Sequence, residues 1–294
     1  MKNQILILST ILLFGCSTDV VKDKKKKDET TTSDTKEYTK KTNKVIDALH
    51  ADKLEVESTK NFDNGLVISW LKHGKGAKIK KGDVINIDYK VTLDNGKIID
   101  GNHFRKMEFF SFVVGFQMQT KGWDIALEEM RVGDFARIKI PSQLARGEKG
   151  IRKEGEKEWF LPPNSMNYLT IRILGKQKPT REIDGTRVFV YEENKVNKVK
   201  FNASNSVIFH YMISSESTPN YSNSYSTNTP YKLLMTDKGS IPGLKKALIN
   251  AKKADRMFVI VPASEAYGVK GLEGSVLPNE DLFYSLLVMD VVPK

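Results

Sequence analysis

Two stretches of the chain repeat each other, and this internal repeat constrains the fold more than any other feature. Residues 122–147 align without a gap on residues 243–268. Identical residues coincide at these positions: Ala126/Ala247, Leu127/Leu248, Asp134/Asp255, Pro141/Pro262 and Ala145/Ala266. A repeat of this length indicates one structural unit that occurs twice. The chain of 294 residues is long enough for two such units, each with its own hydrophobic core.

The apolar pattern predicts the same elements in both copies. Apolar residues alternate along two matching segments, Ile85, Ile87, Tyr89 and Val91 in the first and Val207, Phe209, Tyr211 and Ile213 in the second. This period of two is typical of a β-strand. A helical spacing instead links Trp123, Ala126, Leu127 and Met130. Many strands with one short helix predict an α+β fold in each copy, an antiparallel sheet wrapped on a helix.

Two further motifs predict a hairpin turn and a domain boundary. Asn95-Gly96, between Leu93 and Ile98, predicts a tight hairpin turn. The strand pattern is interrupted at Lys178-Pro179-Thr180. We therefore predict a first domain over residues 61–178 and a second domain over residues 181–294.

The N-terminus has the features of an export signal. Lys2 precedes an apolar stretch, Ile5 to Phe14, that is too short to span a bilayer. The stretch leads to Cys16, the only cysteine of the chain, in a sequence that resembles the bacterial lipobox, whose cysteine receives a diacylglycerol group. We predict a signal peptide over residues 1–15 and a lipid on Cys16. The alternative is an ordinary signal peptide with a cysteine placed there by chance.

Residues 16–60 are predicted to form a flexible, lysine-rich tether that includes a short helix over residues 45–56. A tract with so few apolar residues cannot offset the entropy lost on ordering. Part of the net charge of +11 falls in this tract, where it is typical of a solvated tether or of attraction to anionic lipid. We therefore expect no nucleic-acid partner. The four histidines are scattered singly, and no metal or other cofactor is expected.

The first copy resembles FKBP-type peptidyl-prolyl cis-trans isomerases from about residue 65 to residue 177. The resemblance lies in the order and spacing of short motifs over more than a hundred residues. The motifs are Gly82-Asp83-Val84, Tyr89, Asn95-Gly96-Lys97-Ile98-Ile99-Asp100, Phe112, Val114-Gly115, Gly122-Trp123-Asp124, Met130, Gly133-Asp134, Ile140-Pro141, Ala145, Gly147 and Leu161-Pro162-Pro163-Asn164-Ser165. The resemblance implies an antiparallel sheet curled over a short helix, with an apolar pocket between them.

The resemblance also implies the site residues. Trp123 would form the pocket floor, Asp100 the pocket carboxylate, and the backbone N–H of Thr120 the donor to the substrate carbonyl. The walls would come from Tyr89, Ile99, Phe110, Leu161 and Leu169. The alternatives are a plain core aromatic for Trp123 and a turn residue for Asp100.

The first copy departs from the family pattern at several places. Arg146 stands where the family usually has a tyrosine whose hydroxyl donates to the ligand. Gln119 and Thr120 replace apolar residues, and Ile99 replaces an aromatic residue. A charged insertion, residues 148–159, is expected over the pocket mouth. Catalysis is therefore expected to be weak or tuned to particular partners.

The second copy departs further. Leu244 stands at the tryptophan position, and we place Ser222 at the carboxylate, Ser285 opposite Leu169, and Asn279 at the second proline of the Pro-Pro pair. A Ser/Asn/Thr-rich loop over residues 214–229 falls where the family builds one pocket wall. The aromatic residues that remain are Tyr211, Tyr231 and Tyr267. These changes predict an intact fold with a poor or absent catalytic pocket.

Two functions follow from this reading. The first is a prolyl isomerase, active through its first domain, that assists the folding of proline-containing exported proteins. The second is a non-catalytic binding or scaffold lipoprotein of an envelope machine, because FKBP-like lipoproteins associated with gliding motility resemble this plan. In either case we expect a lipid-anchored protein of the bacterial cell envelope, in the inner or the outer membrane. Under enterobacterial sorting rules, Ser17 after the cysteine favours the outer membrane facing the periplasm.

Overall fold

The computed structural model describes residues 54–293, apart from residues 106, 153–154 and 156. The predicted signal peptide, Cys16 and the tether up to residue 53 lie outside the described residues. The helix predicted over residues 45–56 is therefore described only at residues 54–56, which are not helical. Strand β1 begins at Ser58, inside the segment predicted as tether, and pairs with β2. Within the described residues, no helix is long and apolar enough to cross a membrane.

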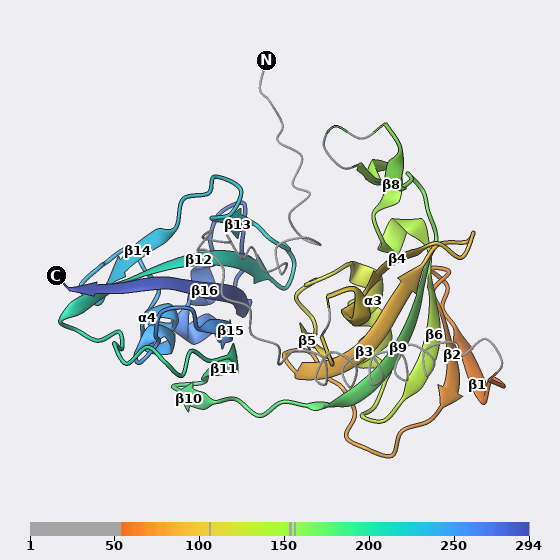
Figure 1. Ribbon diagram of the computed structural model, residues 1–294, viewed down its shortest axis with the longest axis horizontal. Coiled ribbons are helices and arrows are strands. Elements are labelled where there is room, and N and C mark those ends of the chain that lie inside the picture. Colours follow the sequence, from red (N-terminus) through yellow and green to blue (C-terminus); the bar gives the residue numbers. More distant parts are fainter. Residues whose placement is uncertain (1–53, 106, 153–154, 156, 294) are drawn as a thin grey trace, which may run out of the picture. The chain divides into compact units, whose positions relative to one another are not determined.

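The described chain forms two compact units and two seven-stranded sheets (Figure 1). The first sheet has the order β1-β2-β6-β9-β3-β4, and β5 pairs with β3. Its strands are β1 (Ser58–Asn61), β2 (Val67–Lys72), β3 (Val84–Thr92), β4 (Ile98–Gly101), β5 (Phe110–Val113), β6 (Phe135–Ile140) and β9 (Asn167–Lys176). Between them lie helix α3 (Lys121–Glu128), the 3₁₀ turns η2 (Asn102–Arg105), η3 (Ser142–Leu144) and η4 (Gly147–Lys149), and a hairpin of β7 (Ile151–Arg152) and β8 (Trp159–Leu161).

The second sheet repeats this plan, with the order β10-β11-β15-β16-β12-β13 and β14 paired with β12. Its strands are β10 (Arg181–Ile183), β11 (Thr186–Glu192), β12 (Asn205–Ser215), β13 (Ser222–Asn223), β14 (Tyr231–Leu234), β15 (Arg256–Val261) and β16 (Leu282–Pro293). Helix α4 (Pro242–Leu248) and the 3₁₀ turns η5 (Ala263–Glu265) and η6 (Gly268–Lys270) complete it. The α+β prediction is therefore confirmed, whereas the domain boundaries 61–178 and 181–294 stay predictions.

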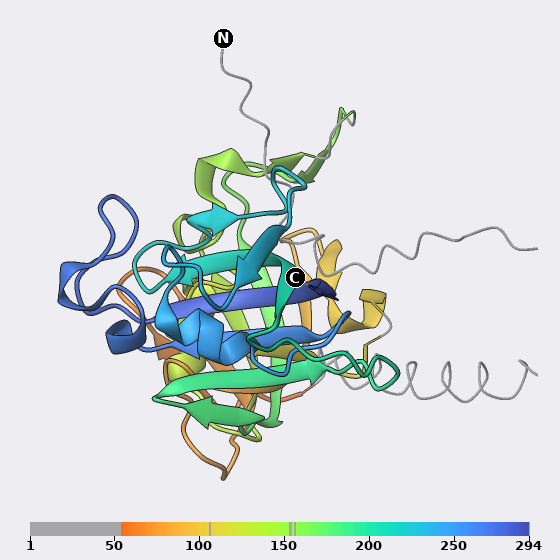
Figure 2. The same cartoon turned by 90° about the vertical axis from the view of Figure 1, so that its left-hand side faces the viewer.

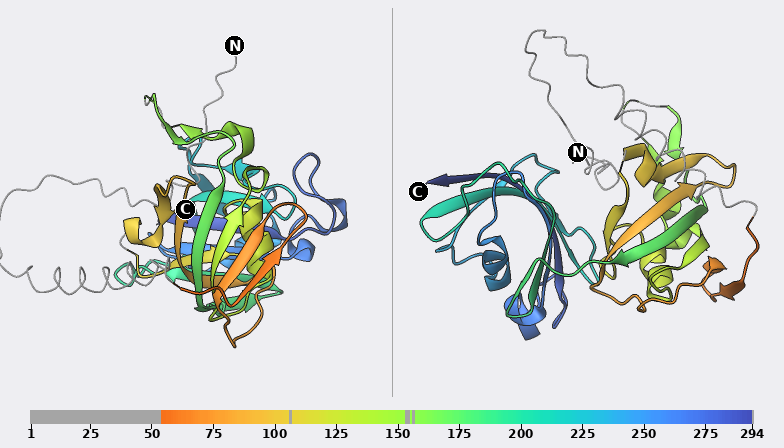
Figure 3. Two further views of the ribbon diagram at one scale, coloured as in Figure 1. Left: turned by 90° about the vertical axis from the view of Figure 1, so that its right-hand side faces the viewer. Right: turned by 60° about the horizontal axis from the view of Figure 1, so that its bottom comes forward.

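In the second copy, the apolar side of the short helix α4 packs into the hydrophobic core. Leu244, Ala247 and Leu248 of α4 are buried in one cluster with residues of β11, β12, β15 and β16. In Figure 2 the second copy faces the viewer, and the right-hand view of Figure 3 shows its sheet curling around α4. Burying a leucine side chain contributes about 1.5–3 kcal/mol, so packing of this face, rather than helix propensity, holds so short a helix.

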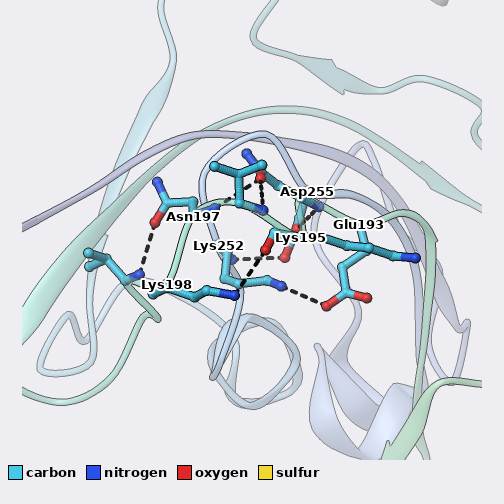
Figure 4. Close-up of polar contacts among 9 residues, drawn as sticks. Glu193, Lys195, Asn197, Lys198, Lys252 and Asp255 are labelled. Atoms are coloured by element: carbon cyan, nitrogen blue, oxygen red, sulfur yellow. Dashed lines mark hydrogen bonds and ion pairs between the residues drawn. The ribbon is translucent and has the colours of Figure 1, made fainter.

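One aspartate in each copy anchors, by hydrogen bonds, the loop that follows the second strand of that copy, β2 or β11. Asp134 accepts hydrogen bonds from Trp70 Nε1 at 3.0 Å and from the backbone N–H of Gly74 at 2.6 Å. Asp255 accepts from the backbone N–H groups of Asn194 at 2.9 Å and of Lys252 at 2.8 Å (Figure 4). Both carboxylates are almost fully buried. The repeated aspartate is thus explained by loop anchoring.

Candidate functional site

Tyr89 and Phe110 form an aromatic pair in the first copy. Tyr89 on β3 is fully buried, and Phe110 begins β5. Their ring centroids lie 5.6 Å apart, and the ring planes are tilted by 59°. The backbone N–H of Tyr89 donates to Oδ1 of Asn102 at 2.9 Å, so the chain that follows β4 is tied to β3. The pair is therefore held in one orientation beside the β3–β4 hairpin.

Asp100 and Ile99 follow the hairpin turn at Asn95-Gly96. Gly96 has φ 77°, a left-handed conformation that glycine adopts without strain, and the predicted turn is confirmed. Asp100 lies opposite Val91 and is 9% exposed, whereas Ile99 is half-buried. A carboxylate that served only to form the turn would be solvated, so its burial favours the functional interpretation.

Trp123 lies near the start of α3 and is 3% exposed. Its ring stacks on that of Phe112, with centroids 5.4 Å apart and an interplanar angle of 16°. Phe110 and Phe112 are two residues apart on β5, so they point to the same face of that strand. One face of β5 thus carries the partner of Tyr89 and the partner of Trp123.

Asp124 is a buried residue whose role the sequence alone does not predict. Its carboxylate accepts the backbone N–H of Gly115 at 2.9 Å and of Gln117 at 2.7 Å. Burial raises the pKa of this carboxyl to about 6, and the two backbone hydrogen bonds only partly oppose that shift. Gly115 and Gln117 both have positive φ, so the side chain fixes an irregular loop. We infer that Asp124 positions the segment that leads to Thr120 and Trp123.

Thr120 and Arg146 occupy turns next to regular elements. Thr120 directly precedes α3, is 8% exposed, and accepts the N–H of Trp123 through its carbonyl at 2.9 Å. Arg146 precedes η4 and is half-buried. Burial lowers the pKa of its guanidinium. A guanidinium stripped of water binds acceptors more strongly than a solvated one, so Arg146 is suited to hold a carbonyl or carboxylate.

Leu161 on β8 and Leu169 on β9 are buried, with 2% and 0% of their surfaces exposed. Leu169 lies opposite Ile138 in the pairing of β6 with β9. The described contacts thus join Tyr89 to Phe110 and Trp123 to Phe112. The assignment of all nine residues to one site stays a prediction.

The strand registers of the two copies identify matching positions independently of sequence identity. Val91 lies opposite Asp100 in the first copy, and Ile213 lies opposite Ser222 in the second. The placement of Ser222 at the carboxylate position is therefore confirmed. The N–H of Tyr211 donates to Ser224 Oγ at 2.8 Å, as the N–H of Tyr89 donates to Asn102.

The same comparison corrects two placements in the second copy. Val259 on β15 lies opposite Tyr284, as Ile138 lies opposite Leu169. Tyr284, and not Ser285, is thus the counterpart of Leu169, and the predicted small polar group on the wall is wrong. Ser285 points to the other face of β16, because neighbours on a strand alternate.

The second correction concerns Asn279. Its N–H donates to the carbonyl of Gly268 at 2.9 Å, as the N–H of Asn164 donates to that of Gly147 at 2.8 Å. Asn279 therefore matches Asn164, Pro278 matches the second proline, and Leu277 replaces the first. Val276 then takes the place of Leu161. The sequence alignment was wrong by one residue after the η6 turn.

Comparison with known families gives one match that covers most of the chain. A family model described as FKBP-type peptidyl-prolyl cis-trans isomerase matches residues 75–174 and 197–289, one range in each copy. The FK506-binding protein 4 of Rhizopus delemar is 33% identical over 111 residues, which are 38% of this chain and 27% of the relative. Its counterpart in Neurospora crassa is 36% identical over 126 residues, which are 42% of this chain and 25% of the relative. The chain thus spans about a quarter of the length of these curated relatives.

A further relative and a solved structure match more of the chain. The peptidyl-prolyl cis-trans isomerase FKBP10 of Mus musculus is 24% identical over 216 residues, which are 73% of this chain and 35% of the relative. Among solved structures, the three FKBP domains of wheat FKBP73 are 20% identical, with a TM-score of 0.38, and the match covers 81% of this chain and 100% of that chain.

Proposed function

Because this chain belongs to the FKBP-type peptidyl-prolyl cis-trans isomerase family, we propose that its first copy catalyses rotation about Xaa-Pro bonds of client proteins. The observation that carries the assignment to the first copy is Trp123. It is the only tryptophan at this helix position in either copy, and it is buried flat against Phe112. The second copy has Leu244 there.

The reaction requires no nucleophile and no proton transfer. Amide resonance gives rotation about a peptide bond a barrier of about 18–20 kcal/mol. In the twisted transition state the resonance is lost, and the carbonyl becomes less dipolar. An apolar site that excludes water binds this species better than the planar ground state, and differential binding of that kind raises the rate.

In this proposal each residue acts by shape or by hydrogen bonding. Trp123 packs against the proline ring, and the Tyr89–Phe110 pair encloses it from β3 and β5. The N–H of Thr120 donates to the carbonyl of the substrate. Arg146 donates a second hydrogen bond to the substrate, in place of the tyrosine hydroxyl that the family usually has. The carboxylate of Asp100 accepts a hydrogen bond from the substrate.

The test is an exchange-NMR measurement of cis/trans rates in short Xaa-Pro peptides with catalytic amounts of the full chain. We expect acceleration by wild type and its loss in Trp123→Ala. Leu244→Ala is the matched control, since Leu244 occupies the same helix position in the second copy. A wild-type protein without activity would contradict the proposal.

A non-catalytic binding protein is the second candidate, and Arg146 is the observation that favours it. A half-buried guanidinium in the first copy is suited to hold a client carboxylate as much as to assist rotation. Tight peptide binding by the first copy without acceleration of exchange would establish this alternative.

We also propose that the chain is a lipid-anchored protein of the bacterial envelope. The support is the short apolar stretch that leads to Cys16 in a chain with no other cysteine. Two anchoring signals would act together, because the lysine-rich tether adds attraction to anionic lipid. Expression of Cys16→Ser tests the proposal. We expect a loss of processing and of membrane attachment, and a variant that stays membrane-bound with unchanged processing would contradict it.

A further inference from the structure

The loop between β11 and β12 of the second copy exposes two valines among three lysines. Residues 195–200 have the sequence Lys-Val-Asn-Lys-Val-Lys, in which Val196 is 88% exposed and Val199 is 52% exposed. The three lysines are exposed as well, and in the part of the chain that the structure describes none of them forms an ion pair with a carboxylate. A single exposed valine is ordinary, but two of them between such cations form a patch.

Hydrogen bonds hold this loop in one conformation (Figure 4). Asn194 Oδ1 accepts from the N–H of Val196 at 2.9 Å and from that of Asn197 at 3.0 Å. Asn197 Oδ1 accepts from the N–H of Val199 at 2.9 Å. The ring of Phe201, just after the loop, is fully buried. A loop that is already ordered loses little conformational entropy when it binds a partner.

The matching loop of the first copy lacks both valines. The two loops match at their starts, where Gly74 and Asn194 donate to the anchoring aspartates. They match at their ends, where Lys78 and Lys200 form bridges to aligned residues. Between these points the first copy has Lys-Gly-Ala, and the second has Lys-Val-Asn-Lys-Val. The longer loop of the second copy therefore supplies both exposed valines.

The segment beside the loop changes in the same direction. The N–H of Asn250 donates to the carbonyl of Phe201 at 2.9 Å, so the chain that follows α4 lies next to the loop. The ungapped alignment places Ile249 at the position of Glu128 and Asn250 at that of Glu129. Ile249 is 36% exposed. The second copy thus has an exposed apolar residue here and lacks two carboxylates that the first copy has.

Two glutamates directly precede the loop, and both are paired with cations of the next strand region. Glu192 lies 3.1 Å from Nε of Arg256, and Glu193 lies 2.6 Å from Nζ of Lys252. The charge left over on this surface is that of the three loop lysines. A cationic surface with exposed apolar side chains binds at the boundary between the headgroups and the acyl chains of an anionic bilayer.

We propose that this valine–lysine patch, formed by Lys195, Val196, Lys198, Val199 and Lys200, binds the surface of an anionic phospholipid bilayer. The lysines attract the headgroup phosphates, and the valines enter the interface. A nucleic acid would make no use of the valines, and the five patch residues include no aromatic ring on which a base could stack.

The inference extends the proposed lipid anchoring. A lipid on Cys16 would keep a bilayer near the chain and so raise the effective concentration of headgroups at the patch. The attraction of a few lysines is weak alone, and it becomes effective as a second anchoring signal. The binding itself requires neither acylation nor isomerase activity, so the two proposals can fail separately.

The experiment uses the full chain with Cys16→Ser, which leaves no cysteine, and with Val196→Cys labelled by the fluorophore NBD. The probes are vesicles of phosphatidylcholine with about 30% phosphatidylglycerol, and vesicles of phosphatidylcholine alone. We expect the emission to rise several-fold and to shift to shorter wavelengths on the anionic vesicles only. The matched label is Ala77→Cys, on the exposed loop of the first copy, and its emission should stay unchanged.

Substitutions in the labelled chain test the two parts of the patch. Lys195→Gln with Lys198→Gln should raise the lipid concentration for half-maximal response about tenfold or more, because each lysine near an anionic surface adds attraction. Lys72→Gln with Lys75→Gln removes the same charge from the first copy and should change it less than about twofold. Val199→Ser, which removes apolar surface alone, should raise it about threefold.

The proposal is overturned if the label at Val196→Cys does not respond to anionic vesicles, if the label at Ala77→Cys responds equally, or if the two pairs of lysine variants have equal effects. A label at Val196→Cys that responds to polyglutamate but not to vesicles would overturn it in favour of an acidic protein partner. Because Cys16 is replaced in every chain used, none of these failures would count against acylation of Cys16.

Discussion

The two copies share a sheet plan and differ at the residues on which a ligand would lie. β6 pairs with β9 as β15 pairs with β16, and an aspartate anchors the same loop in each. At the candidate site, however, the first copy has Trp123, Asp100 and Arg146 where the second has Leu244, Ser222 and Tyr267. The positions that specify the core have thus been kept while those of the site have changed.

This difference changes the chemistry of the side chains at the site positions, whereas the sheet plan stays the same. Replacement of Trp123 by leucine removes rigid aromatic surface from the helix. In the second copy, phenols stand at three of the other positions, where Tyr221, Tyr267 and Tyr284 take the places of Ile99, Arg146 and Leu169. Substitutions at matching positions can test which properties the two copies share and in which they differ.

The largest effect is expected from removal of the loop anchors. Asp134→Ala should lower the free energy of unfolding of the first copy by about 4 kcal/mol, because hydrogen bonds to a charged group contribute about 1.5–3 kcal/mol each. Asp134 accepts from Trp70, Gly74 and Arg131, and Asp255 from Asn194 and Lys252. Asp255→Ala should therefore cost the second copy less. Urea unfolding of both variants measures the difference, and equal losses would contradict the comparison.

The second effect is a pH dependence that comes from Asp124 in the first copy. The pKa of Asp124 is raised from 3.8 to about 6, so folding takes up a proton between these values. The stability that this proton uptake gives is complete below about pH 4 and is lost as the pH rises through 6. The loss is about 3 kcal/mol, from about two pKa units at 1.36 kcal/mol each.

Asp124→Asn isolates this contribution. Wild type should lose about 2 kcal/mol relative to Asp124→Asn between pH 4 and pH 6.5, which is most of the full change, measured by urea unfolding at a series of pH values. The second copy has Lys245 at the aligned position and should show no such change. A wild-type curve parallel to that of the variant would mean that Asp124 is not buried as described.

The smallest effect is expected from exchange of the residues at the rim. Arg146→Tyr should raise the isomerase rate of the full chain a few-fold, because it restores a neutral donor where the family usually has one. Tyr267→Arg in the second copy should leave that rate unchanged. Exchange NMR on Xaa-Pro peptides checks both. A rate lowered by Arg146→Tyr would show that the guanidinium itself assists catalysis.

Much of the fold could be predicted from the sequence because its signals are local. Alternation along residues 85–91 marks a strand, and Asn95-Gly96 fixes a hairpin turn. Asp100 and Ser222 were matched correctly, since both lie within a short distance of an aligned strand.

The rest depends on pairing between distant segments. Between the aligned glycines Gly147 and Gly268 and the last strand, the first copy is six residues longer than the second. From the sequence, a gap of five residues, which aligns Ser285 with Leu169, is as plausible as the gap of six that aligns Tyr284. Only the pairing of β15 with β16 decides it. Tyr221 was missed because it lies in a polar loop whose composition favours an irregular structure. The burial of Asp124 likewise cannot be read from a motif.

The central claim is that catalysis resides in the first copy because of the aromatic floor on its helix. It is tested most directly by kcat/KM for an Xaa-Pro peptide, measured in the full chain with Trp123→Leu and, separately, with Leu244→Ala. The account predicts that Trp123→Leu, which gives the first copy the residue of the second, lowers kcat/KM at least about a hundredfold, equivalent to about 2.7 kcal/mol of transition-state stabilisation. It predicts that Leu244→Ala leaves kcat/KM within about twofold of wild type. A Trp123→Leu protein that keeps most of its activity, while Leu244→Ala loses it, would contradict the claim.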